Sequence, residues 1–253
     1  MRKLSHRFST AGLKAPGQDQ RRAPAPTGVT LSQSGRPGQG GPGLGGTGLV
    51  ADDLYLMAHH EVSGKPFLQP RALGTGLAGG LLAELMLDGG ITWWHDGTVV
   101  PGRFLPADAV AKQVRGQVAA EHELHQVREW LQFLARTAAA DVAARLGRSG
   151  YLTWDSGRAP WRPRRWVPVD PDWSFSPMLR VRSALDPART WSAYGAVLAG
   201  LALACGLGFR IAQYAAPASR SLDQMTWQLK PGLQELITQT QTAVDSTVLS
   251  HRM

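Results

Sequence analysis

The chain contains a single cysteine, Cys205, so no internal disulfide can form. Cys205 lies in an apolar run, where it is most simply a small buried residue, and we interpret the compartment as reducing. The sequence also lacks an apolar run of the roughly 20 residues that a transmembrane helix needs. No apolar segment of the signal-peptide type follows the basic start Met1-Arg2-Lys3. We therefore expect no transmembrane helix and, at most, a peripheral membrane contact.

Acidic residues are in the minority, because 19 Asp and Glu stand against 27 Lys and Arg, which gives a formal net charge of +8. A basic chain favours an anionic partner, either nucleic acid or an anionic lipid surface. Most of the excess lies in residues 1–48, where a single acidic residue faces Arg2, Lys3, Arg7, Lys14, Arg21, Arg22 and Arg36. This Gly-, Pro- and Ser-rich segment is predicted to be disordered. It is either a solvated tail or an electrostatic tether to anionic lipid.

The stretch around which the rest of the chain is organised is 76–91, with the sequence GLAGGLLAELMLDGGI. Its leucines and methionine recur so that apolar side chains cover most of a helix. This pattern predicts a buried central helix and not a one-sided surface helix. The glycines at 89 and 90 are expected to end the helix, since glycine adopts the left-handed conformation of a C-cap. Residues 91–94 are typical of a short strand.

Helical periodicity marks most of the remaining sequence. It predicts further helices at 52–60, 108–130, 138–146, 197–207, 221–229 and 233–249. Asp52 and Asp53 open the first of these segments, and acidic residues suit the start of a helix. The segment 197–207 is apolar on nearly all sides and predicts a second buried helix. The last two segments are separated by a proline and a glycine, which break a helix.

A short β-type segment at 151–154 precedes the most unusual composition in the chain. Within nine residues lie Arg158, Trp161, Arg162, Arg164, Arg165 and Trp166, with prolines between them. We interpret this segment as a hairpin tip or a long loop. At a membrane, tryptophan inserts at the interface and arginine binds phosphate at two points. Two alternatives are stacking on nucleic-acid bases, and indoles packed on the domain beside solvated arginines.

Several stretches taken together resemble the Golgi phosphoprotein 3 family. They are DDLYLMAHHEVSGKP, GLAGGLLAELMLDGGI, RLGRSGYL and LDPARTWSAYGAVLAGLALACGL, and their order agrees with the family over about residues 49–210. The Ala-, Gly- and Arg-rich composition resembles bacterial members. The resemblance implies a mostly helical domain with a protruding β-hairpin and an adaptor role without enzymatic activity. In eukaryotic members it implies peripheral binding to phosphatidylinositol 4-phosphate, with the membrane-facing hairpin where this chain has its Trp/Arg segment.

The resemblance also implies a head-group pocket. The family pairs a tryptophan and an arginine at the central helix with two arginines on a later helix. This sequence has Gln69 and Ala78 at the first two positions, and Arg136 and Ala139 at the other two. Only Arg136 is kept, with Arg71 nearby as a substitute. The departure favours a less selective anionic surface over a site specific for phosphatidylinositol 4-phosphate.

We therefore predict a mainly α fold for residues 49–253, a helical bundle around a buried central helix with a protruding β-hairpin, preceded by the disordered tail 1–48. The predicted function is that of a cytoplasmic, non-enzymatic adaptor, peripherally bound to an anionic phospholipid membrane. Protein cargo and a homo-oligomer are further candidate partners, and we expect no cofactor, metal or nucleic acid. Lipid phosphate contacts are predicted for Arg71, Arg136, Arg158, Arg162, Arg164 and Arg165. Membrane insertion is predicted for Trp161 and Trp166.

Two other functions stay open at this stage. A nucleic-acid-binding protein would use the same basic loop and tail, but the sequence has no helix-turn-helix or zinc spacing to support one. An enzyme would need converging titratable groups, and no motif links the candidates Glu84, His59, His60, His122 and His125. Glu84 and a histidine in one open pocket would favour an enzyme. The two later histidines, expected one helical turn apart, are more simply a solvated pair than a metal site.

Overall fold

The computed structural model describes residues 47–94, 96–123, 125–155, 165–186, 189, 192–214 and 222–249. Almost all of the predicted tail 1–48 lies outside the described residues, as do Arg158, Trp161, Arg162 and Arg164. Within the described ranges the chain forms ten helices and two antiparallel hairpins. The predicted fold class, mainly α with a β-hairpin, is confirmed.

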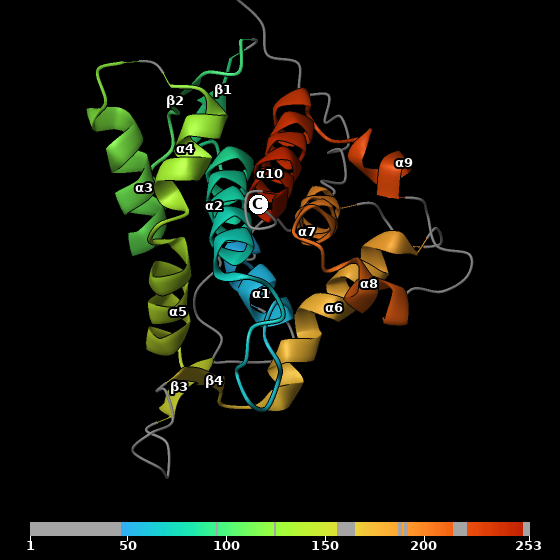
Figure 1. The fold of residues 1–253 in the computed structure, drawn as a ribbon. Helices are drawn as coiled ribbons and strands as arrows, with labels where there is room; N and C mark the ends of the chain where they lie inside the picture. The colour runs from blue at the N-terminus through green and yellow to red at the C-terminus, as the bar shows by residue number, and fades with distance from the viewer. Residues whose placement is uncertain are drawn as a thin grey trace, which may run out of the picture. The chain divides into compact units, whose positions relative to one another are not determined.

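The central helix is α2, Pro70–Leu87, and every side chain from residue 72 to residue 85 is buried. It begins at Pro70, earlier than predicted, because proline suits the first turn of a helix. It ends as predicted, with Gly89 in the left-handed region at a φ of 71°. Figure 1 shows α2 in the middle of the bundle. It packs against α1 (Val50–Met57), α4 (Val127–Leu134), α5 (Ala138–Arg148), α7 (Ala193–Ala204) and α10 (Pro231–Leu249).

Small residues let the central helices approach closely. At the crossing of α1 and α2, a Cβ added to Gly80 would lie 2.8 Å from the Cα of Ala51, so the two backbones are in contact. The predicted second buried helix is confirmed as α7, and Cys205 at its C-cap is buried, as predicted. The sulfur of Cys205 occupies the space beside Gly76 of α2, which leaves no room there for a larger side chain.

The single helix predicted over 108–130 is wrong. The chain forms α3 (Ala109–Ala120), turns at Glu121 into an extended conformation, and begins α4 only at Val127. The break occurs because this segment pairs with the first hairpin: the backbone N–H of Val99 donates to His125 O at 3.1 Å, and Val127 N–H donates to Gly97 O at 3.2 Å. The two histidines of the segment are therefore not on a helix.

Two short hairpins flank the bundle. The strands β1 (Ile91–Trp93) and β2 (Val99–Pro101) form the first hairpin, directly after α2. The strands β3 (Leu152–Asp155) and β4 (Arg165–Pro168) form the second, which encloses the Trp/Arg segment as predicted. In Figure 1 the β1–β2 hairpin lies at the top, and the β3–β4 hairpin extends at the bottom, below the end of α5. The antiparallel register places Trp154 directly opposite Trp166.

The remaining helices complete the side of the bundle that carries α7. They are α6 (Pro171–Leu185), α8 (Gly208–Tyr214) and α9 (Leu222–Thr226). The predicted C-terminal pair corresponds to α9 and α10, and α10 begins at the proline that was expected to separate them. Helix α6 was not predicted, since Pro171 and Pro177 both lie within it. Among the described helices none has the length and apolar character required to cross a bilayer.

Candidate functional site

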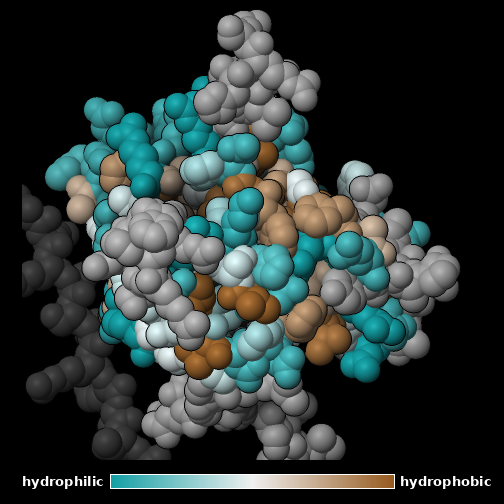
Figure 2. Space-filling view, turned by 60° about the horizontal axis from the view of Figure 1, so that its bottom comes forward, coloured by the Kyte–Doolittle hydropathy of each residue, from teal (hydrophilic) through white to brown (hydrophobic). Residues whose placement is uncertain are grey.

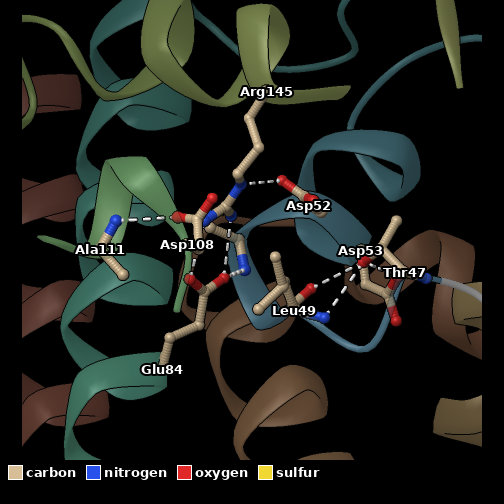
Figure 3. A network of polar contacts seen from close by, with 9 residues as sticks. Thr47, Leu49, Asp52, Asp53, Glu84, Asp108, Ala111 and Arg145 are labelled. Atoms are coloured by element: carbon tan, nitrogen blue, oxygen red, sulfur yellow. Dashed lines mark hydrogen bonds and ion pairs between the residues drawn. The ribbon is translucent and has the colours of Figure 1, made fainter. Parts of the chain in front are cut away.

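A buried arginine holds three helices and the start of a fourth together in the core. Arg145 of α5 donates from Nε to Asp52 of α1 at 2.8 Å and from Nη1 to Glu84 of α2 at 3.0 Å. The same Nη1 donates at 2.9 Å to Asp108, the N-cap of α3, whose other role is to accept from the backbone of Ala111. Figure 3 shows these carboxylates converging on the guanidinium. We call these four charged residues the Arg145 cluster.

The Arg145 cluster carries more negative than positive charge. Burial raises the pKa of Asp52 from 3.8 to about 8, although Arg145 opposes that shift. Burial also raises the pKa of Glu84, again against the attraction of Arg145. Glu84 accepts two bonds from Arg145 and one from the backbone N–H of Ala51 at 2.7 Å, and these bonds oppose the effect of burial on its pKa. For Asp52, a pKa of about 8 keeps most of the proton bound at neutral pH.

This assignment predicts a pH dependence of stability that replacement of Asp52 by asparagine should weaken. The folded state keeps a proton on Asp52 that the unfolded state releases, so the free energy of unfolding should fall as pH rises from about 4 to about 8. The contribution has a limiting slope of about 1.4 kcal/mol per pH unit. Urea unfolding of both proteins at about pH 6 and about pH 8 measures it. Parallel profiles for the two proteins would show that Asp52 is ionised when folded.

A second buried carboxylate fixes the start of the described chain. Asp53 accepts from the backbone N–H of Thr47 at 3.2 Å and from its hydroxyl at 3.0 Å. Its other oxygen accepts from the hydroxyl of Tyr194 at 2.8 Å and lies 3.4 Å from the guanidinium of Arg180. The two aspartates expected to favour the start of a helix therefore lie in the core, each with its own polar partners.

Glu84 does not share an open pocket with His59 or His60. Glu84 is buried in the Arg145 cluster, and His59 is buried with Nδ1 2.7 Å from the carbonyl oxygen of Tyr55. Neither lies in an open pocket with the other. His60 accepts from the backbone of its own turn at Val62. Among the described residues no group of three or more His, Cys, Asp or Glu side chains is placed to hold a metal ion.

The β3–β4 hairpin presents one indole to solvent and packs the other. Trp154 is 47% exposed, and its ring lies 4.8 Å from that of Trp166 in an edge-to-face arrangement. Trp166 packs against the core, where its ring fills the space beside Gly147 of α5. Gly64, with a φ of 62°, lies against the backbone of Trp166, where any side chain would clash. Insertion of Trp166 into a membrane stays a prediction, and Trp154 is the better exposed indole.

The loop that touches this hairpin at Gly64 also contacts an arginine that the sequence analysis did not identify. Arg210 of α8 is buried, with Nη1 3.7 Å from Glu61 and its guanidinium carbon 4.7 Å from the centre of the Phe67 ring. Its Nε and Nη2 find no acceptor among the described residues. Exposed Phe67 and Phe209 lie beside it. Figure 2, which brings the bottom of Figure 1 forward, shows apolar residues interspersed with polar ones on this face.

The two arginines predicted in the helical region lie near each other. Arg71 is exposed in the first turn of α2, one turn before Gly74. Gly74 lies against the carbonyl oxygen of Ala135, with no space for a side chain between them, and exposed Arg136 follows directly. Helix α5 then separates Arg136 from the hairpin. The 11 residues of α5 make it about 16 Å long, so the predicted basic residues form two separate groups, one at each end of this helix.

The family comparison covers most of the described residues. The sequence model of Golgi phosphoprotein 3 (GPP34) matches residues 50–240, well over half of the 253 residues. A comparison with curated proteins found no match. The matched span begins with α1 and ends within α10, so it includes the Arg145 cluster, the β3–β4 hairpin and both predicted helical arginines.

Proposed function

The chain belongs to the Golgi phosphoprotein 3 family, and we propose that it is a peripheral, adaptor-type protein that docks on anionic lipid through the β3–β4 hairpin and nearby arginines. The family is Golgi-associated and is not known as an enzyme family. The proposed site of action is the cytoplasmic surface of a membrane. Protein cargo and self-association remain further proposals for an adaptor of this kind.

The observation that carries the proposal is the exposed Trp154 at the base of an arginine-rich hairpin. An indole is favoured at the boundary between headgroups and acyl chains, because part of the ring is apolar and its N–H is polar. The segment enclosed by β3 and β4 adds Trp161 and the arginines at 158, 162 and 164. Arg165 stands at the first position of β4, where it can reach a phosphate.

The hairpin region carries both positive and negative side chains, and their balance determines how strongly it should bind an anionic surface. Between residues 148 and 172 the sequence contains five arginines and three aspartates. Each basic residue near an anionic surface contributes about 1 kcal/mol, and the aspartates offset part of that attraction. A second contact, through Arg71 and Arg136 at the other end of α5, adds to the first. Binding is therefore reversible and sensitive to salt.

Vesicle co-sedimentation of the full chain tests the proposal. We expect the protein to pellet with phosphatidylcholine vesicles that contain phosphatidylserine or phosphatidylinositol 4-phosphate, and to remain in the supernatant with phosphatidylcholine alone. The double variant Arg71→Ala and Arg136→Ala should weaken binding about tenfold or more, because two phosphate contacts are lost. Trp154→Ala should weaken it as well, and raised salt should reduce binding of the native protein.

Matched variants on other surfaces serve as controls. Trp227 is 78% exposed directly after α9, so Trp227→Ala removes an indole that is more exposed than Trp154 and does not lie on the hairpin. The pair Arg103→Ala and Arg128→Ala removes two other exposed arginines. Equal losses in the controls and the test variants, or equal pelleting with purely zwitterionic vesicles, would contradict the proposal. A gel shift on RNA or DNA at physiological salt that exceeds vesicle binding would favour the nucleic-acid alternative.

A further inference from the structure

A pocket of about 350 Å³ lies between α3 and α4, at the other end of the molecule from the β3–β4 hairpin. In Figure 1 the C-terminal end of α3 and the start of α4 are near the top, whereas the β3–β4 hairpin is at the bottom. A volume of this size is in the range of small-molecule sites. Its lining, mostly apolar in area, consists of Gln117, Ala120, Glu121, His125, Glu129, Trp130 and Phe133.

Aromatic rings form one wall of this α3–α4 pocket. The Trp130 and Phe133 rings are 5.9 Å apart and almost perpendicular, and His125 meets Trp130 in the same way at 6.0 Å. Phe133 is 50% exposed although it is a large apolar side chain. The electron-rich face of an aromatic ring attracts organic cations, whereas its edge does not, so the ring faces in this wall are the part suited to a cation.

Two carboxylates stand at the pocket, although the chain as a whole is basic. Glu129 lies 3.2 Å from Nδ1 of His125, and Glu121 lies 3.9 Å from Nε2 of the same ring. Among the described residues neither carboxylate forms an ion pair with arginine or lysine, in contrast to the carboxylates of the Arg145 cluster, although Arg128 also attracts Glu129. Aromatic faces next to incompletely neutralised carboxylates are complementary to a positive charge.

Buried polar atoms in the lining lack partners. Trp130 is only 6% exposed, and its indole N–H has no acceptor among the described residues. The side-chain oxygen of Gln117 is likewise buried and has no donor there. A buried donor without an acceptor costs about 1–3 kcal/mol. Both atoms lie beneath the surface of the pocket, so this cost belongs to the fold, and the pocket offers a ligand its aromatic rings and carboxylates.

We propose that the α3–α4 pocket binds a free, small quaternary ammonium compound, of which choline is a simple example. The methylated cation lies against Trp130 and Phe133, and Glu121 and Glu129 balance its charge. A methylated nitrogen suits the mostly apolar lining better than a primary ammonium, whose three N–H groups would each need an acceptor.

Calorimetric titration with choline, together with the indole N–H resonances of the nitrogen-15-labelled full chain, tests this inference. The native protein should bind choline, and one indole resonance should shift during the titration. Trp130→Phe identifies that resonance by its disappearance. The neutral carbon isostere of choline, dimethylbutanol, has the same shape without the charge, and we expect it to bind on the order of tenfold more weakly. Phosphatidylcholine vesicles should leave the Trp130 resonance unchanged, because the ligand comes from solution.

The key variant is Glu129→Gln, which removes a charge and retains the helix start. Glu129 accepts from the backbone N–H of Gln126 at 3.1 Å, and glutamine at this position can make the same bond. We expect choline affinity to fall on the order of tenfold, while Glu123→Gln, an exposed acid outside the pocket, leaves it unchanged. Equal affinity for dimethylbutanol, unchanged affinity in Glu129→Gln, or no binding at millimolar choline would each overturn the proposal. The vesicle experiments remain independent of this outcome.

Discussion

Replacing Arg145 by methionine should lower the free energy of unfolding by about 3–5 kcal/mol. Methionine fills much of the same volume but carries no charge, so Asp52, Glu84 and Asp108 lose their shared cation. Asp52 and Glu84 are fully enclosed in the core, and neither can recover hydration without opening the interface of α1, α2 and α5. Urea unfolding followed by circular dichroism measures the loss.

Arg148→Met on the same helix is the matched control. Arg148 is exposed in the last turn of α5, and its replacement should change stability by no more than about 0.5 kcal/mol. Adding Asp52→Asn and Glu84→Gln to Arg145→Met should restore part of the stability, because amides of the same size stay uncharged at every pH and need no buried cation. An Arg145→Met protein as stable as the Arg148→Met control would mean that the cluster is accessible to water.

The second large effect is expected at the crossing of the first two helices. Gly80→Val should destabilise the fold by about 3 kcal/mol, because the new side chain meets the backbone of Ala51 and α1 must move away from α2. Valine favours a helix over glycine by a few tenths of a kcal/mol, which is too little to offset the clash. Thermal and urea unfolding of the purified variant check the prediction.

Gly116→Val provides the comparison for that result. Gly116 lies within α3, is exposed, and has nothing within 4 Å of the position a Cβ would take. The two substitutions are chemically identical, so the difference in unfolding free energy isolates the contact with α1. If Gly80→Val and Gly116→Val unfold alike, close packing of the two helices contributes little to stability.

The elements best predicted from the sequence are those whose signal lies within their own residues. Helices α2 and α7 are apolar on nearly every side, and the glycine after α2 marks its end. The break between α3 and α4 contains no proline or glycine to indicate it. The helix is interrupted because the segment around His125 pairs with β2, and a contact between segments distant in sequence leaves no local sequence pattern.

The charged core could not be anticipated for the same reason. Asp52 and Glu84 contact a guanidinium that lies 93 and 61 residues away in sequence. Without that distant partner, each acidic residue would be expected on the solvent-exposed side of its helix. Arg210 and Trp154 were missed because their significance comes from neighbours in space, the ring of Phe67 and the indole of Trp166. The Trp/Arg segment was recognised because its composition is unusual wherever it lies.

Helix α5 gives the proposed lipid contacts the geometry of a bivalent ligand. It runs from the residue after Thr137, beside Arg136, to the turn that leads into β3, and Arg145 fixes it to α1 and α2 along the way. Once a bilayer holds one end, the other stays at a high local concentration relative to the same surface, and avidity exceeds either single affinity. That gain depends on a rigid spacer. Under the proposed lipid docking, the buried Arg145 therefore lengthens the residence of the protein on a membrane, because it keeps α5 rigid between the two contacts.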